Sequence, residues 1–394
     1  MTREDLKSLS CELSSLCVFR GILKKEQMKA LREVLDCDDN VQKKTELYGA
    51  FVYTLADYDY CFSDFLIHAV YEDENRYIIA AAQKREVPEV VSQNASKELA
   101  LFTKLTEIGA GDFFESTGYE GYIPSFENRY IDFEKSYQER LDHIERFGYG
   151  IFASAKMFTV SNQRITAVEA PDEITAESFV GYEGERKQVF ENTRALIEGR
   201  PAANVLLCGD AGTGKSSTVK ACANHFYDRG VRLIEIRKDQ LLSLSYIMGE
   251  IAKQPLKFII FIDDLSFNKN DDCFSMLKAA LEGSASAKVK NAVIYATSNR
   301  RHIIKEQFSD RGISDDVHRN DTMQELMSLS DRFGLVVYFS KPNKSLYLEI
   351  VHTLAERNGI AIAQTELDIK AEAFALARGS RSPRAAEQFI NGLL

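Results

Sequence analysis

A glycine-rich loop at residues 209–216 constrains this chain more than any other feature. The loop reads GDAGTGKS and lies between an apolar run at 204–208 and a helix-compatible run at 217–227. Glycines let backbone N–H groups turn around phosphate oxygens, the lysine brings a positive charge to the β- and γ-phosphates, and the serine hydroxyl can bind Mg²⁺. We therefore expect a nucleotide-phosphate site between a strand and a helix. The predicted binding residues are Gly209, Asp210, Ala211, Gly212, Thr213, Gly214, Lys215, Ser216 and Ser217, and Ser216 is also a predicted metal ligand.

A second motif is the apolar stretch 257–262, which ends in two acids, Asp263 and Asp264. A buried strand would deliver Asp263 beside the nucleotide, where its carboxylate can hold Mg²⁺ through water. We expect Asp264, the following residue, to orient the attacking water. Two acids after a strand more often begin a loop, but Asp263 follows Lys215 by 48 residues, and this context favours the functional interpretation.

The second half of the chain alternates short apolar runs with helical segments. Strands are expected at 203–208, 231–236, 257–262, 291–297 and 335–339. Strands separated by helices are typical of a parallel sheet that is covered on both faces. The last stretch, 341–394, returns to a helical pattern and is long enough for a small lid.

The front of the chain, residues 1–150, has a mostly helical pattern. Four leucines between residues 6 and 16 fall three and four residues apart, as on one face of an amphipathic helix. Further helical stretches are expected at 23–36, 41–56, 60–71, 94–108 and 127–147. We expect Tyr119, Tyr122 and Tyr130 to pack between helices rather than form a surface. No catalytic motif is apparent in this half.

Length and composition favour a protein of several folded units. The chain has 394 residues, of which 45% are hydrophobic and 27% charged, as in globular proteins with real cores. We expect a helical N-terminal domain at 1–150 that binds a partner or regulates, a connector at 151–178, an α/β nucleotide-binding core at 179–340 and a helical lid at 341–394.

The charge is uneven, and this bears on partners. Residues 1–170 carry 29 acidic against 20 basic side chains, which accounts for −9 of the net charge of −10. An acidic N-terminal half is a poor match for a nucleic-acid backbone. A protein partner is therefore favoured, and nucleic acid is possible but disfavoured.

Cysteine usage and hydropathy indicate a reducing, aqueous compartment. The seven cysteines form no CxxC pair, which favours reduced thiols over disulfides or a zinc site. The N-terminus does not have the pattern of a signal peptide, and the longest apolar run is far shorter than the roughly 20 residues that span a bilayer. We expect a cytoplasmic protein that does not enter the membrane.

From residue 178 onward, several segments together resemble the AAA+ ATPase module. The stretch 178–183 (SFVGYE) is similar to the segment that frames adenine in that family, and the resemblance implies that Val180 and Gly181 bind the nucleotide. Asn299 follows a predicted strand where the family has a polar residue near the γ-phosphate. The resemblance implies an α/β parallel-sheet P-loop core with a small helical lid, and ATP and Mg²⁺ as cofactors.

Two arginines extend the resemblance. The segment SDRFG around Arg332 is similar to the segment that carries the family's arginine finger, and SPRAA around Arg384 opens a lid helix as a sensor-2 arginine does. The resemblance implies catalytic roles for Asp264, Asn299, Arg332 and Arg384. Because the finger is normally supplied by a neighbouring subunit, it also implies a homo-oligomer.

Within the superfamily, the nearest resemblance is to an uncharacterised bacterial family of predicted AAA+ ATP-binding proteins, over about residues 145–394. It rests on the phrases GYGIFA (148–153), FIDDLSF (261–267), IYATSNRRH (294–302) and SLSDRFGL (328–335).

Two departures affect the predicted chemistry. Asp264 stands where most members of the superfamily have glutamate, so the carboxylate is one methylene shorter, which is consistent with slow hydrolysis. The step from Asn299 to Arg332 is 33 residues, longer than expected, and leaves Arg311 as a competing candidate for the finger.

Several functions remain open at this point. The favoured one is an AAA+ ATPase that remodels, loads or regulates a protein partner. The alternatives are a slow nucleotide-dependent switch and a nucleic-acid-associated loader. A small-molecule P-loop kinase is less favoured, because Asn299 and the arginine-bearing lid follow the AAA+ order.

Overall fold

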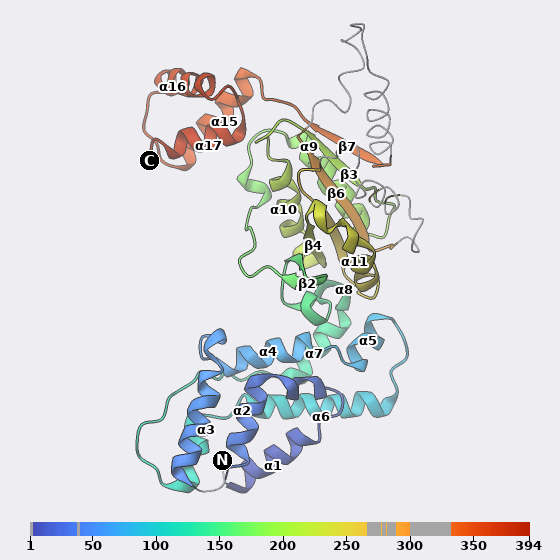
Figure 1. Ribbon diagram of the computed structural model, residues 1–394, viewed down its shortest axis with the longest axis vertical. Helices are drawn as coiled ribbons and strands as arrows, with labels where there is room; N and C mark the ends of the chain where they lie inside the picture. Colours follow the sequence, from blue (N-terminus) through green and yellow to red (C-terminus); the bar gives the residue numbers. More distant parts are fainter. Residues whose placement is uncertain (1–2, 38–39, 266–276, 278–280, 282–288, 300–331) are drawn as a thin grey trace. The chain divides into compact units, whose positions relative to one another are not determined.

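The computed structural model describes residues 3–37, 40–265, 277, 281, 289–299 and 332–394 (Figure 1). The chain divides into two compact units, Met1–Ser154 and Ala155–Leu394. Each described cysteine is a free thiol. No helix in the described part of the chain is both long and apolar enough to cross a membrane.

The N-terminal unit is built of helices joined by short 3₁₀ turns. The helices are α1 (Arg3–Ser14), α2 (Glu26–Leu35), α3 (Val41–Tyr53), α4 (Phe62–Glu72), α5 (Arg76–Ala82), α6 (Glu89–Leu105), α7 (Phe133–Asp142) and α8 (Ile144–Phe147), and the 3₁₀ turns are η1 (Arg20–Lys24), η2 (Ala56–Tyr58), η3 (Ala110–Phe113), η4 (Glu115–Thr117) and η5 (Gly150–Ala153). The helical character expected for this part of the sequence is confirmed.

Aromatic rings fill the core of this unit. Phe19 meets Phe102 and Tyr137 edge-on, with ring centroids 5.5 and 5.3 Å apart. Such edge-to-face pairs add to the free energy gained by burying the rings. The core therefore connects the loop that follows α1 with the helices α6 and α7.

A buried carboxylate holds the same loop in place. Glu98 on α6 is 8% exposed, and it accepts hydrogen bonds from the backbone N–H groups of Cys17, Val18 and Phe19 at 2.8, 3.1 and 2.8 Å. These bonds satisfy amides that have no helical partner. Glu98 therefore acts as a structural cap.

The expectation that the tyrosines of segment 119–130 pack between helices is wrong. Tyr122 is 83% exposed, Tyr130 64% and Tyr119 37%. The segment lies outside helices, between η4 and α7, and it has no apolar periodicity that would turn these rings inward.

In the described part of the second unit, seven strands form one sheet. They are β1 (Met157–Ser161), β2 (Arg164–Ala167), β3 (Val205–Gly209), β4 (Val231–Ile236), β5 (Lys257–Ile262), β6 (Ala292–Ser298) and β7 (Leu335–Phe339), in the order β2-β1-β4-β5-β6-β3-β7. All neighbours are parallel except β1 and β2. The five expected strands are confirmed, and those at 231–236, 257–262 and 335–339 have the predicted bounds.

The segment 151–178 is more than the connector that the sequence suggested. It contains β1 and β2, which extend the sheet, and the 3₁₀ turn η6 (Ala176–Ser178). Asn162 and Gln163 link the strands with φ values of 49° and 59°, as a two-residue hairpin turn requires. The residues of β2 are mostly exposed, so the sequence has no alternating pattern there that would predict a strand.

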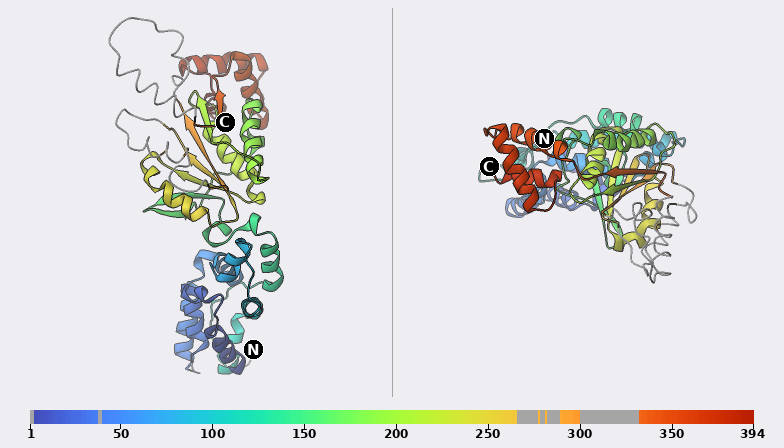
Figure 2. Two further views of the ribbon diagram at one scale, coloured as in Figure 1. Left: turned by 90° about the vertical axis from the view of Figure 1, so that its right-hand side faces the viewer. Right: turned by 90° about the horizontal axis from the view of Figure 1, so that it is seen from above.

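Helices cover this sheet and form the lid. α9 (Glu183–Ile197), α10 (Lys215–His225) and α11 (Leu244–Ile251) belong to the core, with the turns η7 (Tyr227–Arg229) and η8 (Lys238–Ser243). The lid comprises α15 (Lys344–Arg357), α16 (Gln364–Ala377) and α17 (Pro383–Asn391), which pack on one another around a shared apolar core (Figure 2). The predicted fold class is confirmed: an α/β core with a mostly parallel sheet and a small helical lid, preceded by a mostly helical N-terminal region.

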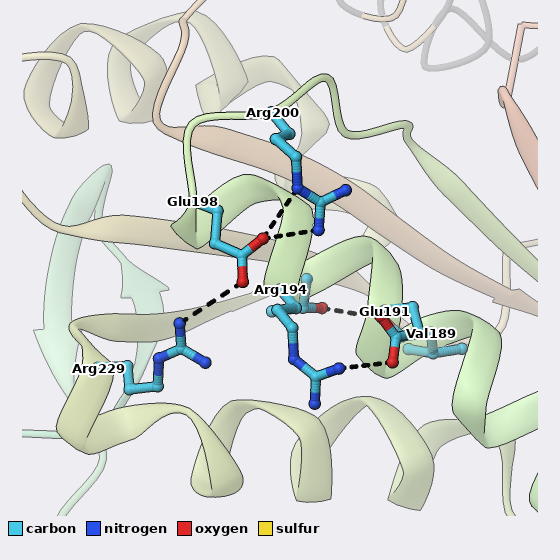
Figure 3. A network of polar contacts seen from close by, with 7 residues as sticks. Val189, Glu191, Arg194, Glu198, Arg200 and Arg229 are labelled. Carbon is cyan, nitrogen blue, oxygen red and sulfur yellow. Dashed lines mark hydrogen bonds and ion pairs between the residues drawn. The ribbon is translucent and has the colours of Figure 1, made fainter.

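A charged network lies at the end of α9 (Figure 3). Glu198 pairs with Arg200 at 2.7 Å and with Arg229 of η7 at 4.0 Å, and Glu191 pairs with Arg194 at 2.5 Å. These side chains are 39–56% exposed, so solvent screens their interactions and each pair contributes about 0–1 kcal/mol. The network is a surface feature of the fold.

Candidate nucleotide-binding site

A cavity of about 390 Å³ opens where β3, β5 and β6 end. In open α/β sheets, ligands bind at the carboxyl ends of the strands, and the volume lies within the range for small-molecule sites. Of the site residues predicted from the sequence, the following line the cavity: Val180, Ala211, Gly212, Thr213, Gly214, Lys215, Ser216, Ser217, Asp263, Asp264, Asn299 and Arg384.

The glycines of the loop adopt backbone conformations that other residues rarely reach. Gly209, Gly212 and Gly214 have φ values of 143°, 76° and 89°. A Cβ atom on Gly209 would lie 2.0 Å from the carbonyl oxygen of Phe339, and one on Gly212 would lie 3.1 Å from the Cβ of Arg384. The tight curl of the loop therefore depends on glycine.

Lys215 begins α10 at the base of the cavity and is 5% exposed. Its ammonium group donates to the carbonyl oxygens of Gly209 and Asp210 at 3.0 and 2.6 Å and to Asn299 Oδ1 at 2.9 Å. Burial lowers the pKa of Lys215, and neighbouring acids, Asp210 first, oppose this shift. Gly209 and Asp210 are not among the residues that line the cavity. Their carbonyl groups instead bind the ammonium group of Lys215.

Ser216 and Asp263 are joined across the loop. The Ser216 hydroxyl donates to Asp263 Oδ1 at 2.6 Å, and the Thr297 hydroxyl donates to the same oxygen at 2.6 Å. Because the proton of Ser216 is directed to the carboxylate, the lone pairs of its oxygen are available to a cation. Hydroxyl and carboxylate oxygens, completed by phosphate and water, are the ligands that Mg²⁺ prefers, so the donor set fits that ion.

Asp264 has an uncommon backbone conformation and a fixed side chain. Its φ is 52°, in the left-handed region, which a non-glycine residue occupies only when its surroundings hold it there. Its N–H group donates to Thr297 Oγ1 at 2.9 Å, and its carboxylate accepts from Asn299 Nδ2 at 2.8 Å. The Asn299 amide therefore bridges Lys215 and Asp264.

The start of α17 lies against the phosphate loop. The backbone N–H of Arg384 donates to the carbonyl oxygen of Gly212 at 3.2 Å. Ser382 caps the helix by accepting from the N–H of Ala385 at 3.2 Å, and Pro383 occupies the first turn. These contacts direct Arg384 to the cavity from the lid.

Apolar side chains also line the cavity. Val180 lines it, whereas Gly181 does not. Gly181 has a φ of 72°, and a Cβ there would lie 2.6 Å from Leu346 Cδ1. Glycine at this position therefore serves the close approach of α15.

Several lining residues were not predicted from the sequence. Phe179, Tyr182, Arg186, Thr297, Ile350, Leu354 and Glu387 all line the cavity. Arg186 is the clearest case, because its guanidinium lies 5.0 Å above the ring of Phe179 and burial lowers its pKa. In the sequence, Arg186 is one of several charged residues in α9. Only the position of Phe179 in the folded structure identifies Arg186 as a residue of the cavity.

Of the two finger candidates, the structure describes only Arg332. Arg332 lies in the turn before β7 and is not among the described residues that line the cavity. Arg311 lies outside the described residues.

The fold and the site together define an α/β protein with a glycine-rich phosphate loop of the P-loop type. Residues 152–394 match the family described as "Protein of unknown function (DUF815)", and the chain belongs to that family. A comparison with curated proteins yields no match.

Among solved structures, the chain has a distant likeness to RuvB of Thermotoga maritima, described as a Holliday junction branch migration motor. The two are 13% identical over 55% of this chain and 71% of that one, with a TM-score of 0.34. A variant of the same RuvB is 14% identical over the same shares, also with a TM-score of 0.34.

Proposed function

We propose that this protein binds ATP with Mg²⁺ and hydrolyses it, as an ATPase of the AAA+ class. The observation that carries the proposal is the glycine loop whose Lys215 lies at the base of a cavity and whose Ser216 is hydrogen-bonded to Asp263. The cavity combines the buried ammonium group of Lys215, the curled backbone amides of the loop, and oxygen ligands from Ser216 and Asp263. These are the groups that a metal-bound triphosphate needs.

Each residue of the site has a role in this proposal. Lys215 contacts the β- and γ-phosphates, and Ser216 and Asp263 hold the metal. Mg²⁺ would neutralise phosphate charge and draw electron density from the γ-phosphate. Asp264 orients the attacking water and accepts its proton. Asn299, which reaches both Lys215 and Asp264, fixes the water relative to the γ-phosphate.

The arginines would stabilise charge that develops on the phosphates. Arg384 reaches the cavity from its own lid. Arg332 does not line the cavity of its own chain, which supports supply by a neighbouring subunit of a homo-oligomer. An arginine aimed at a transferring phosphoryl group accelerates the reaction by about 10³–10⁵-fold.

A calorimetric titration of the full chain tests nucleotide binding. We expect MgATP to bind, and Lys215→Ala to weaken binding by at least about 100-fold, because the variant loses the charge at the phosphates. Lys370→Ala is the matched control, since Lys370 pairs with Glu366 on the exposed face of α16. Absence of binding by the unmodified chain to ATP or GTP, or equal affinity of the two variants, contradicts the proposal.

A slow nucleotide-dependent switch is a second candidate, and one observation favours it. The carboxylate of Asp264 is short, and the Asn299 amide engages it. Asp264→Glu should then raise turnover at saturating MgATP. An unchanged or lower turnover counts against Asp264 as the base.

The biological role that we propose is to remodel, load or regulate a protein partner through the N-terminal unit. This unit is acidic, and Tyr53, Tyr122 and Tyr130 are 76%, 83% and 64% exposed. Tyrosine is enriched in protein interfaces. Co-purification with an Asp264→Asn variant, which should retain ATP, can recover the partner, and recovery that does not change with ATP contradicts this role.

A further inference from the structure

Thr297 lies at the point where β5 and β6 separate. The pairing of β5 with β6 ends at Ile262 and Ala296, so Thr297 is the next residue along β6. On its other side it remains paired with Leu207 of β3. Its side chain is 2% exposed. The threonine is therefore held by the central sheet while the neighbouring strand ends beside it.

Three consecutive residues after β5 are hydrogen-bonded to Thr297. Its hydroxyl donates to the carboxylate of Asp263 at 2.6 Å and accepts from the N–H of Asp264 at 2.9 Å. Its carbonyl oxygen accepts from the N–H of Leu265 at 2.7 Å. One residue thus sets the path of the chain through both acids.

The backbone of Asp264 shows why such an anchor is needed. Its φ of 52° turns the chain between the two acids, so that the Asp263 carboxylate meets Ser216 while that of Asp264 meets Asn299. A non-glycine residue stays in this conformation only when outside contacts hold it. The methyl group of threonine also restricts χ1, which keeps the hydroxyl directed at both partners.

We propose that Thr297 is a positioning residue, which orients Asp263 for the metal and Asp264 for the water through one hydroxyl group. The inference rests on the proposed function, because it assigns these two tasks to the acids. It adds a residue whose own side chain needs no contact with ATP. Loss of the Thr297 hydroxyl should therefore lower the part of the ATP affinity that depends on Mg²⁺.

The test compares Thr297→Val, which keeps the shape and loses the hydroxyl, with Thr297→Ser, which keeps the hydroxyl. ATP affinity of the full chain is measured by calorimetry in excess Mg²⁺ and again in EDTA. We expect Thr297→Val to reduce the ratio of the two affinities by about tenfold or more, as loss of a hydrogen bond to a charged group implies. The affinity in EDTA should change less than about twofold, and Thr297→Ser should restore the ratio.

A double-mutant cycle tests whether Thr297 acts through Asp263. Asp263→Asn should itself reduce the ratio, and adding Thr297→Val to it should change the ratio by less than about twofold. Full additivity overturns the inference. So does an equal loss of affinity with and without Mg²⁺, because that indicates a merely structural role.

Thermal melting without nucleotide shows whether each variant is folded. If Thr297→Val does not fold, Thr297→Ala and Thr297→Ser make the same comparison, since they differ only in the hydroxyl. An unmodified chain that binds no ATP in either buffer contradicts the proposed function. A chain that binds ATP, with a ratio that Thr297→Val leaves unchanged, contradicts this inference alone.

Discussion

Lys215 already has a full set of hydrogen bonds in the structure. An ammonium group has three donors, and those of Lys215 are directed to two loop carbonyls and to Asn299. Phosphate oxygens would have to compete with these acceptors. Because Asn299 also binds Asp264, a ligand that draws Lys215 away would change the hydrogen bonding of the candidate base.

A second residue of interest belongs to the N-terminal unit. Asp73, at the end of α4, accepts a hydrogen bond from Asn75 at 3.1 Å. Burial raises its pKa to about 6, and the Asn75 hydrogen bond only partly opposes this effect. The fold therefore favours the protonated form of this carboxyl group.

The raised pKa of Asp73 predicts a pH-dependent stability. Between the unfolded value of 3.8 and about 6, the folded chain binds more protons, so the free energy of unfolding falls as pH rises. The Asp73→Asn variant should have the same free energy of unfolding as the unmodified protein near pH 3.8 and a higher one at neutral pH. Because the carboxyl group is partly solvated, we expect a difference of about 1–2 kcal/mol. Urea unfolding across this range measures it.

Asp57→Asn is the control for that measurement, since Asp57 is exposed in η2 of the same unit. We expect no comparable change from it. A variant Asp73→Asn whose stability follows the same pH curve as the unmodified protein would contradict the assignment.

At the scale of elements, α17 connects the lid to the phosphate loop. Its first residues touch Gly212, through the Arg384 N–H bond and the close approach of Ser382. The helix has a capping serine and a proline in its first turn, as is typical of a defined helix start. The same local signals that begin the helix therefore also shape the cavity.

Removal of this cap should affect binding as well as stability. Ser382→Ala should lower the free energy of unfolding by about 1 kcal/mol and should also weaken ATP binding, because the helix start frays beside Gly212. Asn343→Ala removes the cap of α15, where the side chain accepts from the Leu346 N–H at 2.8 Å. It should cost similar stability with a smaller loss of affinity. Denaturant unfolding and calorimetry compare the two, and equal losses of affinity would argue against a special role for α17.

At the scale of the whole molecule, three clusters of buried apolar residues in the described part of the chain each lie within one of the two units. One cluster runs from Leu6 to Tyr149, a second from Met157 to Phe339, and a third, within the lid, from Tyr347 to Ile390. A unit with its own core can fold by itself.

We therefore expect a fragment of residues 155–394 to fold and to bind nucleotide. Its affinity for MgATP should lie within about threefold of that of the full chain, because the described cavity residues all belong to this unit. Circular dichroism and calorimetry on the purified fragment check this. A fragment that is folded but does not bind ATP would show that the N-terminal unit contributes to the site.

The sequence by itself determined the features that depend on short stretches of chain. The loop 209–216 is recognisable because curled backbone requires glycine, and β4, β5 and β7 because each is a short, mainly apolar run between helical segments. The same signals located Asp263 at the end of β5. Helix starts such as Ser382 are likewise local, because a cap bonds to an amide only three residues away.

Only the tertiary structure decided which distant residues meet. Thr297 bonds to residues 32 to 34 positions earlier, and Arg186 faces the cavity because it stacks on Phe179. The hairpin β1–β2 gains its place from pairing with β4, and Tyr122 is exposed in the segment between η4 and α7. Hydrogen bonds and burial across such separations depend on how elements pack, and no short stretch of sequence contains that information.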